Sequence, residues 1–219
     1  MRVFLVSFIL SIATVNAEPD WILEGTAAWQ ARDSQAEWVF KDRLWIGGGW
    51  FQSFEEPPRD VWASSDGKSW SLIEKSAPWS PRAYHQAVVL NDKIYILGGG
   101  NYVPSYHAKK DVWSSSDGVN WTCETESAPW DPRLWFSAAV YRGRIWVLGG
   151  WSKEKDNFGD VWHSADGRSW QRLETKTCWK ARHEHSVFVF QNKLWVAGGH
   201  ARPLSSEVWS LSLPKDWKP

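Results

Sequence analysis

Short apolar runs alternate with polar pairs along most of the chain. Residues 87–90 and 94–97 are two such runs, separated by Asn91-Asp92, and Arg142-Gly143 separates a similar pair. Runs of this length bounded by turn-forming residues predict β-strands. A two-residue polar connection between them predicts a tight antiparallel hairpin. The pattern therefore predicts an all-β chain built from short hairpins.

The hairpins belong to a repeat with a period near 50 residues. A glycine pair closes the second run of each unit, at intervals of 51, 51 and 49 residues: Gly47-Gly48, Gly98-Gly99, Gly149-Gly150 and Gly198-Gly199. A second motif follows each pair: Asp60-Val61-Trp62, Asp111-Val112-Trp113, Asp160-Val161-Trp162 and Glu207-Val208-Trp209. A period of this size indicates a repeat architecture.

Two further motifs complete the unit. A Trp-x-x-Arg motif opens each copy, with the arginines Arg32, Arg82, Arg133 and Arg182. A turn of the type Ser65-Asp66-Gly67 with Trp70 returns as Ser116-Asp117-Gly118 with Trp121, and as Ala165-Asp166-Gly167 with Trp170. Each unit thus reads as four short antiparallel strands, which is the blade of a β-propeller.

A glycine pair that closes an apolar strand and is followed by spaced aromatic residues resembles the kelch repeat. The resemblance covers essentially all of residues 18–219, although Trp stands where kelch repeats often have Tyr at the first of the two aromatic positions. The Ser-x-Asp-Gly-x-x-Trp turn resembles a shortened Asp-box of sialidase propellers. The resemblance implies one kelch-like propeller domain over residues 18–219.

The two ends of the chain predict how the ring closes. Trp21-Ile22-Leu23-Glu24 aligns with Trp70-Ser71-Leu72-Ile73 at a spacing of 49, whereas the last unit has no fourth strand of its own. We therefore expect four four-stranded blades, the last closed by the N-terminal strand, because pairing the ends removes an open sheet edge. A closed monomer is favoured, and two chains in a larger ring are the alternative.

The charge balance and the N-terminal segment indicate which partners and which cellular location to expect. The chain has 25 Lys and Arg against 25 Asp and Glu, so it lacks the positive field that nucleic-acid binding requires. Arg2 precedes an apolar stretch that ends at Val15-Asn16-Ala17, which predicts a signal peptide over residues 1–17 and a secreted or periplasmic protein with no integral membrane segment after its removal. Cys123 and Cys178 leave both one disulfide and two free thiols open.

The longer, variable loops lie on one face of the predicted propeller, and binding sites on rigid scaffolds concentrate in such loops. Aromatic and polar side chains on this face are the candidate ligand-binding residues: Trp50, Phe51, Tyr84, His85, Tyr102, Trp135, Trp151, Glu184, His185, His200 and Arg202. The four repeated arginines are predicted to be structural, stacking on aromatics or bonding backbone carbonyls at the blade junctions.

Chemistry beyond binding has weaker support in the sequence. In a four-blade ring His85 and His185 would face each other near the channel mouth, but their spacing is too loose to predict a metal site. No nucleophile elbow, phosphate loop or HExxH motif occurs, and we predict no catalytic residue and no cofactor. We therefore expect a binding module for a protein or glycan ligand. The alternative is a carbohydrate-active enzyme, sialidase-like or sialic-acid-isomerase-like.

Overall fold

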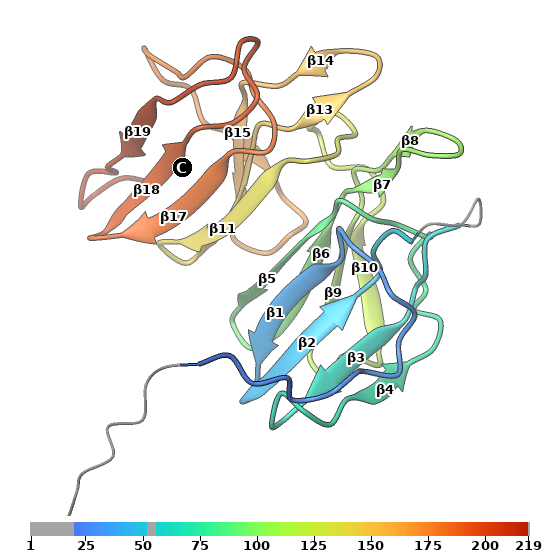
Figure 1. Cartoon of the computed structure of the whole chain (residues 1–219). Helices are drawn as coiled ribbons and strands as arrows, with labels where there is room; N and C mark the ends of the chain where they lie inside the picture. Colours follow the sequence, from blue (N-terminus) through green and yellow to red (C-terminus); the bar gives the residue numbers. More distant parts are fainter. Residues whose placement is uncertain (1–19, 52–55, 219) are drawn as a thin grey trace, which may run out of the picture.

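The computed structural model describes residues 20–51 and 56–218, so the predicted signal peptide at 1–17 lies outside the described residues. All regular structure in the described ranges is β (Figure 1). None of these residues forms a helix that could cross a membrane. The predicted all-β fold is confirmed.

Four antiparallel sheets follow one another along the chain, and we number them sheets 1 to 4. Sheet 1 contains β1 (Ala36–Phe40), β2 (Arg43–Gly47), β3 (Val61–Ser64) and β4 (Ser71–Glu74). Sheet 2 contains β5 (Gln86–Leu90), β6 (Lys93–Leu97), β9 (Val112–Ser115) and β10 (Trp121–Thr125). Sheet 3 contains β11 (Ser137–Tyr141), β12 (Arg144–Leu148), β15 (Val161–Ser164) and β16 (Gln171–Arg172). Sheet 4 contains β17 (Ser186–Phe190), β18 (Lys193–Ala197) and β19 (Val208–Leu211).

Two small hairpins project from the connections that follow the glycine pairs. They are β7 (Gly100–Asn101) with β8 (His107–Ala108), and β13 (Trp151–Ser152) with β14 (Asp156–Asn157). Figure 1 shows both hairpins at the same end of the sheets. They therefore extend the face that carries the longer, variable loops.

The core lies between successive sheets. The first strands β1, β5, β11 and β17 form an inner row in which each contacts the next (Figure 1). Trp38 and Phe40 of sheet 1 pack against Ile94 and Ile96 of sheet 2, and equivalent layers follow between sheets 2 and 3 and between sheets 3 and 4. Large rigid rings suit these wedge-shaped layers, which accounts for much of the tryptophan content.

The predicted closure by the N-terminal strand is not present. Residues 20–28 form no strand, the side chains around Trp21 are exposed, and sheet 4 has three strands in the described part of the chain. Glu24 instead pairs with Lys68 in the turn between β3 and β4, at 2.6 Å. The segment therefore lies beside its own first sheet, and sheets 1 and 4 each keep one uncovered face.

Candidate functional site

The residue two positions after each repeated arginine has a left-handed backbone. The φ angles of Ser34, Tyr84, Trp135 and Glu184 are 53°, 56°, 50° and 53°. The Tyr84 N–H donates to the Ser34 carbonyl and the Glu184 N–H donates to the Trp135 carbonyl, both at 3.0 Å, so neighbouring sheets are linked there. Non-glycine residues in this conformation are strained, and such strain concentrates at functional sites. This conformation recurs in all four sheets, on the loop face where the candidate side chains gather.

Aromatic side chains gather around one of these residues. The ring centroid of Trp135 lies 5.0 Å from Tyr84, 5.1 Å from Tyr102 and 5.5 Å from Trp151. Tyr106 adds a fifth ring, 5.8 Å from Trp151. We call these five residues the aromatic cluster. Tilted and edge-on contacts of this kind stabilise aromatic groups beyond the area they bury.

The two small hairpins hold the aromatic cluster in place. The Trp151 indole N–H donates to Asp156 Oδ1 at 3.0 Å across β13 and β14. The Tyr106 hydroxyl donates to Glu154 at 3.1 Å and accepts from the Lys153 N–H at 3.0 Å. Tyr102 remains 45% exposed, so part of the aromatic cluster is accessible to a ligand. The result is a preorganised surface of aromatic rings edged by polar groups, a composition typical of binding sites.

Next to the aromatic cluster lies a group of metal-ligating side chains, His183, Glu184 and His200. One donor atom of each lies within 4.8 Å of the others, and the His183 ring is 5.7 Å from Trp135. The Asn157 amide donates to the His200 carbonyl at 2.8 Å, which turns its oxygen toward His183 Nδ1 at 2.6 Å. His183 Nδ1 therefore carries the proton, leaving the Nε2 lone pair free. Two imidazoles and a carboxylate could hold an ion of the zinc class.

Three other candidates lie around this face. Trp50 is half-buried, with its indole N–H 3.4 Å from the Val103 carbonyl, whereas Phe51 is buried. Arg202 is exposed and pairs with Asp156 at 3.0 Å, beside the hydrogen bond from Trp151. The structure therefore brings most of the predicted loop residues together, but Phe51 is not accessible to a ligand.

The predicted placement of His85 and His185 at the channel mouth is corrected. Both rings are buried, and each lies against a glycine of the preceding sheet, His85 against Gly48 and His185 against Gly149. Phe136 occupies the equivalent position against Gly98. Because a phenyl ring serves the same purpose there, the position needs a flat ring rather than a base. Burial lowers the pKa of His85 to about 3 and that of His185 to about 4, so both are neutral at pH 7.

The repeated arginines have a structural role that the sequence predicted only in part. Arg82 donates to the Gly98 carbonyl at 3.0 Å, as expected, and its guanidinium also forms two hydrogen bonds with Asp111. The same carboxylate accepts from the Trp113 indole at 2.7 Å. Equivalent arrangements occur in the other sheets, and they join Arg32 to Asp60, Arg133 to Asp160 and Arg182 to Glu207. These buried arginines are fully occupied, so they are not available to an acidic ligand.

Sequence reasoning missed two features of the site. The acidic partners of the arginines could have been found, because Glu207 keeps a carboxylate where the other copies have Asp. Asn157 carried no such signal, since its role depends on the hairpin that places it beside His183 and His200. Cys123 and Cys178 are both free thiols.

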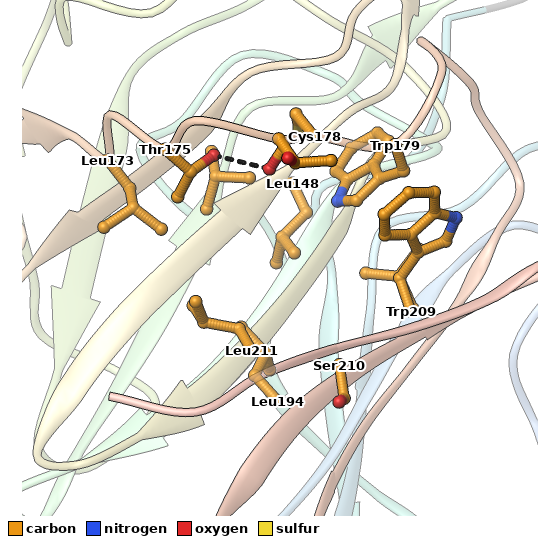
Figure 2. A pocket seen from close by; sticks show the side chains of 12 residues that line it. Leu148, Leu173, Thr175, Cys178, Trp179, Leu194, Trp209, Ser210 and Leu211 are labelled. Atoms are coloured by element: carbon orange, nitrogen blue, oxygen red, sulfur yellow. Dashed lines mark hydrogen bonds between the residues drawn. The ribbon is translucent and has the colours of Figure 1, made fainter. Parts of the chain in front are cut away.

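A second concave site lies away from the loop face. An apolar hollow of about 80 Å³ lies between sheets 3 and 4, and Figure 2 shows the side chains that line it. Leu148 and Leu173 line one side, Leu194, Trp209 and Leu211 the other. Trp179 and the segment around Cys178 cover it, and Thr175 donates to the Thr177 carbonyl at 2.9 Å. Because these side chains are mostly apolar, the hollow can make van der Waals contacts with a ligand but has few groups for catalysis.

Comparison with known proteins identifies the fold as a kelch-repeat fold. Residues 34–218 match the family model of the KLHDC2/KLHL20/DRC7 Kelch-repeats domain. The solved structure of YjhT, a kelch β-propeller, superposes with a TM-score of 0.64 at 19% identity, over 77% of this chain and 59% of that one. At that identity the superposition shows the fold alone.

Three curated proteins are similar in sequence to parts of this chain. The dynein alpha chain of the flagellar outer arm of Chlamydomonas reinhardtii is 39% identical over 83 residues, which are 36% of this chain and 2% of the relative. Spermatocyte protein spe-26 of Caenorhabditis elegans is 27% identical over 112 residues, 50% of this chain and 19% of the relative. Alpha-scruin of Limulus polyphemus is 25% identical over 130 residues, 55% of this chain and 13% of the relative. The chain thus spans less than a fifth of each relative's length.

Proposed function

Because the chain belongs to the kelch-repeats family, whose propellers are typical protein-interaction modules, we propose that it binds a protein partner through the aromatic cluster on its loop face. The observation that carries the proposal is the packing of Trp135 against Tyr84, Tyr102 and Trp151. Binding energy at protein interfaces concentrates in rigid aromatic anchors of this kind.

The surroundings of the aromatic cluster suit an extended peptide. Asp156, Glu154 and Arg202 edge the rings with both signs of charge, so hydrogen-bonding groups are within reach of a backbone that lies over the rings. The net charge of the chain is zero, which favours no strongly charged partner. Export of the protein stays part of the proposal, and it rests on the sequence of residues 1–17.

Glycans are the other ligand class that the same rings suit, since sugar rings also stack on aromatic side chains. The enzyme alternative has less support. A sialidase-like site needs arginines free to bind a carboxylate, and Arg32, Arg82, Arg133 and Arg182 are each engaged by a carboxylate of the chain itself. The residues of the proposed site therefore favour binding without catalysis.

Panning a displayed random-peptide library against the purified protein tests the proposal. We expect selected peptides to lose at least tenfold in affinity on Trp135→Ala and on Tyr102→Ala. Val119→Ala is the matched control, because Val119 is 44% exposed against 45% for Tyr102 but lies in the turn between β9 and β10. Peptides that bind all variants equally would show that the cluster is not the site. A parallel glycan array distinguishes the two ligand classes.

A further inference from the structure

Sheet 4 ends the array with an uncovered apolar face. Phe188, Phe190 and Val208 are 55%, 60% and 63% exposed. Their counterparts in sheet 1 are Trp38, Phe40 and Val61, all buried beneath sheet 2. Sheet 4 thus carries the surface that sheets 1 to 3 use to hold the next sheet, with nothing from the described residues packed on it.

Sheet 1 begins the array with the opposite surface uncovered. Val39 is 65% exposed and Leu44 is 44% exposed. Their counterparts in sheet 2 are Val89 and Ile94, which pack beneath sheet 1. Glu37 is a charged exception on this face, at the position of Ala87. Exposed apolar patches of this kind in a soluble protein mark interaction surfaces.

We infer that the two end faces pack against each other between two copies of the chain, head to tail. In each of sheets 1 to 3, the face that corresponds to the uncovered face of sheet 4 packs against the following sheet. In each of sheets 2 to 4, the face that corresponds to the uncovered face of sheet 1 packs against the preceding sheet. Sheet 1 of one copy would then cover Phe188 and Phe190 of the other as sheet 2 covers Trp38 and Phe40. In a dimer with twofold symmetry this contact forms twice, so the uncovered faces of sheets 1 and 4 are buried in both copies.

The missing strand of sheet 4 supports the same partner. In sheets 1 to 3 the opening tryptophan contacts the tryptophan at the start of the fourth strand. The ring centroids are 4.7, 4.4 and 5.9 Å apart for Trp29–Trp70, Trp79–Trp121 and Trp130–Trp170. Among the described residues no such strand lies beside Trp179, which instead covers the apolar hollow. Trp21, which aligns with Trp70, is 99% exposed.

Residues 21–24 of the second copy therefore complete sheet 4. The connection that leads from β4 to β5 between sheets 1 and 2 corresponds to residues 25–35, which lead into β1. A copy whose sheet 1 packs on sheet 4 thus brings its own residues 21–24 to the open edge of β19. In sheet 1 the register pairs Trp62 with Leu72 and Ala63 with Ser71. At the equivalent positions of sheet 4, this register predicts that Trp209 pairs with Leu23, and Ser210 with Ile22, of the second copy.

Light scattering coupled to gel filtration measures the oligomeric state. We expect the mature chain to have the mass of a dimer, and Phe190→Glu to give folded monomers, because a buried carboxylate without a partner is costly. Val119→Glu introduces the same charge at an exposed turn outside both faces and is expected to stay dimeric. A monomeric wild-type chain, or a dimer that Phe190→Glu leaves intact, would overturn the inference.

Cysteine pairing tests the exchanged strand directly. With Cys123 and Cys178 replaced by serine, one chain carries Ile22→Cys and another carries Ser210→Cys. Mixing the two under mild oxidation is expected to give a disulfide-linked pair of chains, because directly opposed strand residues lie within disulfide reach. The control partner is Ser169→Cys, an exposed turn position expected not to react. A third chain carries both Ile22→Cys and Ser210→Cys. If a disulfide forms only within this chain and not between the two single variants, residues 21–24 pair with sheet 4 of their own chain and the proposal fails.

Discussion

The guanidinium of Arg82 and the carboxylate of Asp111 are joined by two hydrogen bonds, of 2.9 and 2.7 Å, between the segments that lead into β5 and β9. Arg82 is fully buried, and the pKa of Asp111 is lowered by its hydrogen bonds to Arg82 and Trp113 against the opposing effect of burial. The pair ties the entry of sheet 2 to its third strand, and its counterparts do so in every sheet.

Asp111→Asn is expected to lower the free energy of unfolding by about 3–5 kcal/mol, because it leaves the Arg82 charge buried without a counterion. Urea denaturation followed by circular dichroism measures the loss. Asp131→Asn is the control, since Asp131 pairs with Lys155 on an exposed surface, where an ion pair contributes about 0–1 kcal/mol. Equal losses in the two variants would contradict a special role for the buried pair.

Gly118→Ala is expected to destabilise the protein by about 2–4 kcal/mol, because a Cβ there would overlap the Trp45 ring of sheet 1 and overpacking adds to the cost of a positive φ. The turn that follows β9 would have to move away from sheet 1. Gly143→Ala has a similar φ, with no atom within 4 Å of the added carbon, and should cost only about 1 kcal/mol. Thermal unfolding of both variants gives the difference.

His85 makes stability depend on pH. Burial lowers its pKa from 6.5 to about 3, with a further lowering by Arg82 and an opposing contribution from Asp111. Since the unfolded chain takes up a proton below about pH 6.5 and the folded chain does not, stability falls as the pH drops through this range. The loss from this one group is about 1.4 kcal/mol per pH unit.

His85→Phe should flatten that part of the stability profile between pH 6.5 and 4.5, since Phe136 shows that a phenyl ring fits against the preceding glycine pair. Urea midpoints across this range provide the measurement. At pH 7.5 the variant is expected to unfold at the wild-type midpoint or above it, because no buried polar ring atom is left unpaired. A slope unchanged by the substitution would show that folding does not lower the pKa of His85.

Much of the fold could be predicted because its determinants are local. Asn91 and Asp92 both have positive φ values, of 50° and 56°, as a two-residue hairpin turn requires, so the predicted connection between β5 and β6 is confirmed. The positions of Trp21 and Trp217 could not be inferred in this way. Whether either residue belongs to a fourth strand depends on a strand edge that is free to pair with it, which is not a local property. Trp217 packs against Trp146 and His163 of sheet 3.

The candidate site was predictable only where topology alone decides the position. The alternation of strand direction places Tyr84, Tyr102, Trp135 and Trp151 on one face, and the structure brings them into contact. The orientation of a single side chain depends on its packing partner. For that reason the rings of His85 and His185 pack against the glycine pairs, while His183, two residues before His185, lies beside Glu184 and His200 on the loop face.

The sheets pack in series, with contacts between the first strands of neighbouring sheets, and this arrangement has a kinetic consequence. Contacts form between neighbouring repeats, so no distant pairing has to be found before stability accumulates, and folding of a single chain can start in any sheet and spread. Amide protons in β6 and β12, which have neighbours on both sides, should exchange slowest. Those in β19 should exchange first, and association of two chains should slow them.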